Sequence, residues 1–276
     1  MLWKGSRSVA LFMLYVVASG ALAMVWRAVY APYLRSVGIS PSLYGVLGSV
    51  YSISSLLGMV LSSIAIDRMG LVRTLALTTV VWGLALTGFG LAKEFSAFVP
   101  LALVNGFAAS MNLIALEVYI SYIFPRERLE HAYSYLYAAM YVSGAVGSFL
   151  AFLPEYASST LGVEKVVCYS ITLITAGLLM ALTTALLLGV EEPREGLARG
   201  SITVSSLARD FLHLGRALWV ILLAEVLIAW GAGMSIQNID YYFMLKYGIG
   251  SAGIGMLHGF EELGLALLTL SMPLVS

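Results

Sequence analysis

The fold is decided by one short segment, Ser62-Ser63-Ile64-Ala65-Ile66-Asp67-Arg68-Met69-Gly70-Leu71-Val72-Arg73. It forms a charged turn of about seven residues between two apolar runs, Pro41–Ile66 and Thr74–Ala92. Each run is close to the ~20 residues that a helix needs to cross a bilayer, so the chain must reverse direction at this segment. Gly70 permits the reversal because glycine tolerates a positive φ. Three charged residues then lie at the membrane face: Asp67, Arg68 and Arg73.

Composition places most of the chain in an apolar environment. Of 276 residues, 60% are hydrophobic and only 11% are charged, whereas soluble domains average about 25% charged residues. The formal net charge is zero, which gives no reason to expect a nucleic-acid partner. Cys168 is the one cysteine and the three histidines lack metal-ligand spacing, so the sequence predicts no metal site and no cofactor.

Hydropathy predicts an all-α polytopic membrane protein in the lipid bilayer, with about eight transmembrane helices. Most connections are short, but residues 191–217 form a polar linker. The predicted spans are Val9–Tyr33, Pro41–Ile66, Thr74–Ala92, Phe98–Phe124, Ala132–Leu153, Lys165–Val190, Leu218–Phe243 and Ser251–Ser276.

The distribution of Lys and Arg predicts the orientation. With the N-terminus inside, the inner segments carry ten of these residues and the outer segments carry four. This excess favours a cytoplasmic N-terminus in the inner (cytoplasmic) membrane. The segment at Asp67 and the 191–217 linker are then both cytoplasmic.

An internal repeat indicates two related bundles. A shift of 210 residues aligns Gly38 with Gly248 and Gly45 with Gly255, and it maps the first two spans onto the last two. We therefore predict a six-helix bundle over residues 1–190, a linker over 191–217 and the start of a second bundle over 218–276. The chain ends just before the counterpart of Asp67, so we expect further C-terminal helices to be needed for full function. A protein that naturally has eight spans is the alternative.

The charged segment resembles the loop between the second and third helices of the major facilitator superfamily, Gly-x-x-x-Asp-Arg-x-Gly-Arg-Lys/Arg. Asp67, Arg68 and Gly70 match this pattern, while Ser63 replaces its first glycine and Arg73 comes one position late. The stretches 124–128 and 231–243 add to the resemblance. It implies two six-helix bundles that rock about a central site, and it implies that Asp67, Arg68, Gly70 and Arg73 form a conformational latch. The family's antiporter motif in the fifth helix is not matched.

Polar residues at membrane depth are the candidates for a substrate or proton pathway, because a charge there costs roughly 2.5–3.5 kcal/mol. Glu261 and Glu262 lie near the middle of the eighth span, and His258 precedes them by one helical turn. A buried carboxyl group binds its proton more tightly than one in water, so either glutamate is a candidate for proton exchange. The alternative is that this pair only seals a contact between helices.

Two other spans add polar residues. Asn105 and Asn112 share a face of the fourth span, with Glu117 nearer the cytoplasm. In transporters that this chain resembles, the first, fourth and seventh helices line the cavity. The candidates in the seventh span are Glu225, Gln237, Asn238 and Asp240.

Arg27 is the one cation well inside a predicted span. It either snorkels to the interface beside Trp26 and Tyr30, or it lies in the cavity and pairs with Asp240 or an anionic substrate.

The sequence therefore predicts a secondary active transporter for a small solute, working by alternating access and coupled to protons. No enzyme motif is present. A membrane protein of eight spans that does not transport, such as an embedded enzyme or an assembly subunit, is the competing prediction.

Overall fold

The computed structural model describes residues 6–193, 215, 218–221, 223–224, 226–228 and 238–271, and these residues contain helices and no strand. Most of the helices are long. In chain order they are α1 (Ser6–Ser36), α2 (Pro41–Met69), α3 (Leu71–Leu91), α4 (Phe95–Ile123), the 3-10 turn η1 (Arg126–Arg128), α5 (Leu129–Leu150), α6 (Leu153–Leu161), α7 (Lys165–Leu182), α8 (Thr184–Leu187), α11 (Ile239–Tyr247) and α12 (Ser251–Ser271).

Six helical segments are long and apolar enough to cross a membrane: Arg7–Ser36, Pro41–Met69, Leu71–Leu91, Phe95–Ile123, Arg126–Leu161 and Lys165–Leu187. They confirm the first six predicted spans, and their ends differ from the prediction by a few residues at most positions. The predicted seventh span falls partly outside the described residues. The eighth corresponds to α12, a helix of 21 residues that is not among those six. Eight membrane spans are therefore not established.

The segment Ser62–Arg73 is tighter than its sequence predicted. Helix α2 continues to Met69 and α3 begins at Leu71, so Gly70 alone separates them and no loop of seven residues exists. Gly70 has φ 91° and ψ 164°, a region open essentially only to glycine. Its predicted positive φ is thus confirmed, while Asp67 and Arg68 belong to the last turn of α2.

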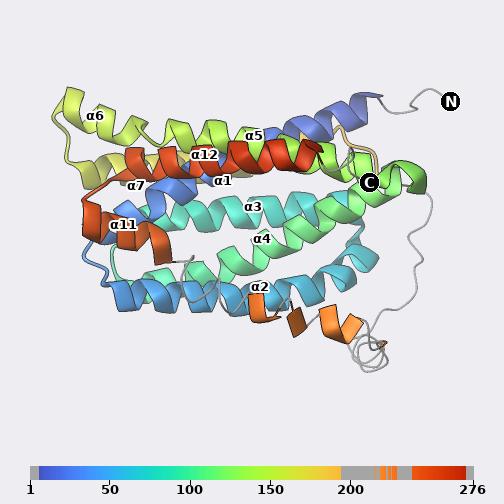
Figure 1. The fold of residues 1–276 in the computed structure, drawn as a ribbon, viewed down its shortest axis with the longest axis horizontal. Helices are drawn as coiled ribbons and strands as arrows, with labels where there is room; N and C mark the ends of the chain where they lie inside the picture. The colour runs from blue at the N-terminus through green and yellow to red at the C-terminus, as the bar shows by residue number, and fades with distance from the viewer. Residues whose placement is uncertain are drawn as a thin grey trace.

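The long helices lie side by side along the longest axis of the molecule (Figure 1). We call the end where α1 begins the proximal end and the end where α1 finishes the distal end. Helix α1 packs on α5 and α7, α3 packs on α4 and α7, and α2 packs mainly on α4. Helix α12 starts at the distal end and runs beside α5.

Helix α5 approaches both α1 and α12 very closely. A methyl group added to Gly147 of α5 would collide with the Ala21 carbonyl of α1, and one added to Gly255 of α12 would collide with the Ser148 carbonyl of α5. Small residues favour such packing in membranes, because apolar side chains gain little by leaving lipid for one another. Helix α5 thus packs closely on both α1 and α12.

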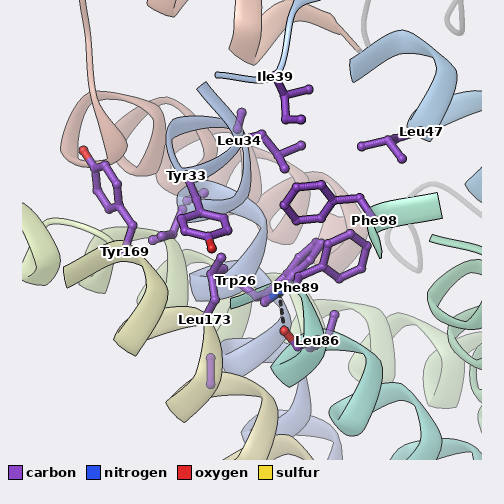
Figure 2. Close-up of a cluster of buried hydrophobic side chains, with 14 of the residues drawn as sticks. Trp26, Tyr33, Leu34, Ile39, Leu47, Leu86, Phe89, Phe98, Tyr169 and Leu173 are labelled. Atoms are coloured by element: carbon purple, nitrogen blue, oxygen red, sulfur yellow. Dashed lines mark hydrogen bonds between the residues drawn. The ribbon is translucent and has the colours of Figure 1, made fainter. Parts of the chain in front are cut away.

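A buried cluster of aromatic and aliphatic side chains fixes the distal half of α1 (Figure 2). Tyr33 donates from its hydroxyl group to the Ala92 carbonyl at 2.6 Å, and Trp26 donates from Nε1 to the Leu86 carbonyl at 3.4 Å. Both acceptors lie at the end of α3 or just beyond it. This anchoring of α1 holds Arg27, the neighbour of Trp26, at the edge of the cavity described next.

Candidate functional site: a cavity between the helices

A cavity of about 740 Å³ opens between α1, α2, α3, α4 and α11, which is the size range of small-molecule sites. Its wall combines aromatic rings with a few polar groups. These residues are Trp26, Arg27, Tyr30, Ser42, Tyr44, Ser49, Tyr51, Trp82, Phe89, Asn105, Asn238 and Asp240. Four of the predicted pathway residues, Arg27, Asn105, Asn238 and Asp240, therefore line one cavity.

Arg27 is the one cation among the described residues of this wall, and its side chain is exposed. Its guanidinium group forms no hydrogen bond or ion pair with any residue that the structure describes. The structure does not bring Arg27 and Asp240 into an ion pair, because Asp240 is held by His258. Arg27 lines the cavity, and its snorkelling to the membrane interface stays a prediction.

Asn105 presents hydrogen-bond donors to the cavity. Its Oδ1 accepts a bond of 2.9 Å from Nε1 of Trp82. An indole nitrogen can only donate, so this bond fixes which end of the amide is oxygen. The amide nitrogen of Asn105 is left without a partner in the described part of the chain.

His258 lies between two carboxylates. Its Nε2 is 3.0 and 3.1 Å from the two carboxylate oxygens of Asp240, and its Nδ1 is 2.9 Å from Oε2 of Glu261. Carboxylates only accept hydrogen bonds, so either both ring nitrogens donate or one carboxyl group is protonated. In either case the three side chains together carry one proton more than a neutral imidazole and two ionised carboxylates would carry. The His258 side chain is 5% exposed and that of Glu261 is 49% exposed, so the group extends from the protein interior to its surface.

Glu262 is buried against α5, with 7% of its surface exposed. A methyl group added to Gly144 would lie 2.9 Å from the Glu262 carboxyl group and 3.2 Å from Met24 of α1. Arg27 and His258 are within electrostatic reach of Glu262. No hydrogen bond or ion pair joins the Glu262 carboxyl group to another described residue.

Asn112 and Glu117 lie away from the cavity wall. Asn112 is buried among α1 and α3, where its Nδ2 donates to Thr79 Oγ1 at 2.9 Å and its Oδ1 accepts from Tyr15 at 3.0 Å. Glu117 accepts a hydrogen bond from the Tyr137 hydroxyl group of α5. Of the other pathway candidates, Glu225 and Gln237 lie outside the described residues.

The predicted latch residues lie at the proximal end. Oδ2 of Asp67 is buried without a hydrogen-bond partner among the described residues. Arg68 and Arg73 form no ion pair within the described part of the chain. Sequence reasoning missed a further acid here: the carboxylate of Glu192 accepts bonds from the Leu71 amide and, at 2.9 Å, from the Val72 amide. The signal in the sequence that could have identified Glu192 was its position in the linker, directly after the sixth predicted span.

Sequence reasoning also missed contacts that join α6 and α1 to the last two described helices at the distal end. Glu155 of α6 accepts from the Ser251 amide at 2.7 Å and from the Tyr169 hydroxyl group at 2.8 Å. Arg35 of α1 donates to the Met244 carbonyl of α11 at 2.6 Å. The described residues contain no cluster of metal-ligating side chains.

The family model described as Major Facilitator Superfamily matches residues 11–276. The crystal structure of a D-xylose-proton symporter is similar with a TM-score of 0.70 and 17% identity, covering 97% of this chain and 69% of that one. The crystal structure of a bacterial homologue of the human lysosomal transporter Spinster, inward-facing and unoccupied, is similar with a TM-score of 0.68 and 16% identity. The match covers 99% of this chain and 61% of that one.

A proton:xylose symporter bound to 6-bromo-6-deoxy-D-glucose gives a TM-score of 0.58 and 16% identity, covering 90% of this chain and 57% of that one. The chain thus spans between 57% and 69% of the lengths of these three structures. At such identities the likeness concerns the fold alone. No curated protein sequence is similar enough to this chain to count as a match.

Proposed function

Because the chain belongs to the Major Facilitator Superfamily, a superfamily of membrane transporters and not of enzymes, we propose that it carries a small solute by alternating access. The first bundle comprises residues 1–190 and the second begins at residue 218. The excess of Lys and Arg in the predicted inner segments supports a cytoplasmic proximal end in the cytoplasmic membrane.

The cavity is the proposed solute site. It lies between helices of the first bundle and α11, the place where the two halves of such a transporter meet. Two hydrogen bonds hold the distal end together: Glu155 accepts from the Ser251 amide of α12, and Arg35 donates to the Met244 carbonyl of α11. Under the proposed orientation these contacts close the outer side.

Proton coupling is the second part of the proposal, and the contacts of His258 are the observation that carries it. Asp240 lines the cavity, His258 bridges it to Glu261, and Glu261 is half-exposed. A proton entering at Glu261 therefore has a hydrogen-bonded route to the cavity wall. Two of the similar structures are proton symporters, which also supports this assignment.

Transport assays on the full-length protein in proteoliposomes test both parts. We expect at least one solute from a panel of sugars, amino acids and organic acids to enter faster under an inward proton gradient. His258→Gln and Asp240→Asn should remove the response to the gradient, because each breaks the hydrogen-bonded route.

The matched control is His131→Gln, since His131 is exposed at the start of α5. Flux of a solute that ignores the gradient in every variant would overturn proton coupling. Absence of flux for the whole panel would overturn transport.

A further inference from the structure

We propose that the solute is a small organic monocarboxylate, that Arg27 binds its carboxylate group, and that a proton on Glu262 keeps Arg27 free to do so. This inference rests on the proposed transport function and names the substrate class of the same cavity. The inference follows from the hydrogen bonds of the cavity wall, where some polar atoms have partners and others have none.

The free polar groups of the wall include strong donors. The guanidinium group of Arg27 has no partner among the described residues, and neither has the amide nitrogen of Asn105, whose oxygen is held by Trp82. The wall's one described carboxylate, Asp240, is already engaged by His258 through both oxygens. A ligand that supplies acceptors therefore fits this cavity, and a carboxylate matches the planar fork of an arginine.

Charge limits the ligand further. Among the described wall residues Arg27 supplies a single positive charge, and a protonated His258 offsets the charge of Asp240. Glu261, the other partner of His258, lies outside the wall and is half-exposed. A monoanion balances Arg27. A dianion such as a phosphate ester would leave one charge uncompensated in surroundings where an unpaired charge is costly.

The rest of the wall suits an apolar body. Rings from Trp26, Tyr30 and Tyr44 line the same cavity as the arginine. Trp26 and Tyr30 are stacked with 4.5 Å between centroids, and Tyr30 and Tyr44 are tilted with 5.9 Å between centroids. The volume of about 740 Å³ accommodates a small organic acid rather than a free inorganic ion.

Glu262 is the proposed holder of the coupled proton, and His258 and Glu261 of the proposed proton route lie within electrostatic reach of it. Glu262 flanks Gly144 together with Met24, and Arg27 lies one helical turn after Met24 on α1. Four groups face Glu262 from the elements around it: Arg27 of α1, Tyr141 of α5, and His258 and Glu261 of α12. Of these, Arg27 is the permanent cation. An ionised Glu262 would therefore compete with the solute for Arg27, whereas a protonated Glu262 would not.

This competition fixes the stoichiometry. One monoanion binds Arg27 and one proton binds Glu262, so each translocation moves no net charge. Transport should then respond to a pH gradient and ignore an imposed membrane potential.

Binding measurements on the purified full-length protein test the substrate class without relying on transport. The probes are benzoate, phenylacetate and lactate, each compared with its neutral amide. We expect at least one carboxylate to bind at least tenfold more tightly than its amide. Arg27→Gln should weaken that binding at least tenfold, Arg27→Lys should restore part of it, and Arg126→Gln, which removes an exposed arginine, should change nothing.

The pH dependence tests the role of Glu262. Raising the pH until Glu262 ionises should weaken carboxylate binding by the wild type, because the ionised carboxyl group competes for Arg27. Glu262→Gln mimics the protonated side chain, so at the high end of the pH series it should bind the carboxylate as tightly as the wild type does at the low end.

Two results would overturn the inference: amides that bind as well as their acids, or carboxylate binding that survives Arg27→Gln. Either result leaves the transport proposal intact, since a neutral solute can still be carried with a proton. Conversely, carboxylate binding without any flux would overturn transport and keep the assignment of Arg27.

Discussion

At the scale of single residues, the buried amide side chain of Asn112 joins two helices through hydrogen bonds. Its side chain is 4% exposed and joins Tyr15 of α1 to Thr78 and Thr79 of α3. We expect Asn112→Ala to destabilise the protein by about 1–3 kcal/mol, the usual cost of leaving buried partners unsatisfied. The lower melting temperature should come with unchanged solute affinity.

Asn105→Ala provides the comparison, because Asn105 lines the cavity and should change affinity instead. A folded Asn112→Ala protein with normal stability and lost solute binding would contradict the structural role. It would favour the pathway role that the sequence predicted.

The two asparagines also mark the limit of sequence reasoning at this scale. Their spacing of seven residues correctly indicates nearly the same face of α4. The spacing does not tell which side chains of other helices that face of α4 contacts along its length. Asn105 meets Trp82 beside a cavity, while Asn112 meets three hydroxyl groups in a filled core. That difference arises from the packing of α1 and α3 on α4, which no single helix encodes.

At the scale of elements, the start of α3 depends on a residue about 120 positions further along the chain. The first amides of a helix lack partners within it, and a carboxylate there also meets the positive end of the helix dipole. Glu192 supplies both interactions through Leu71 and Val72. We expect Glu192→Ala to lower stability by about 1 kcal/mol, as for other lost helix caps.

The control is Glu191→Ala. It removes the same charge from the preceding position, where the side chain is exposed. Thermal unfolding in detergent at low and high salt is the measurement. Equal melting temperatures for the two variants would show that the carboxylate of Glu192 contributes nothing to α3.

Elements were easier to predict than their connections. Twenty-residue apolar runs indicated six helices that the structure contains, since a bilayer imposes length and apolarity on each span. The helix α6 was missed because nine residues with Pro154 and Glu155 at the start carry no membrane signal. One of its roles in the fold is the hydrogen bond between Glu155 and the Ser251 amide, ninety-six positions along the chain.

At the scale of the whole molecule, the Asp67 carboxyl group needs a partner. Its Oδ2 is buried and unpaired in the part of the chain that the structure describes, and buried polar atoms are rarely left so. The resemblance at Ser62–Arg73 implies that the partner lies in the second bundle. The hypothesis is that Asp67 and Arg68 latch the two bundles at the proximal end while the cavity opens at the distal end.

Asp67→Asn in the full-length protein should therefore slow transport and shift the balance between the two open states. Cysteine accessibility at the proximal and distal ends, compared between wild type and variant, measures that balance. Solute affinity at equilibrium should change only as far as the shift requires, because Asp67 lies at the end of α2 and does not line the cavity. Glu130→Gln is the control, since Glu130 is an exposed acid at the same end. An accessibility pattern that Asp67→Asn leaves unchanged would reduce the segment to a topological anchor between α2 and α3.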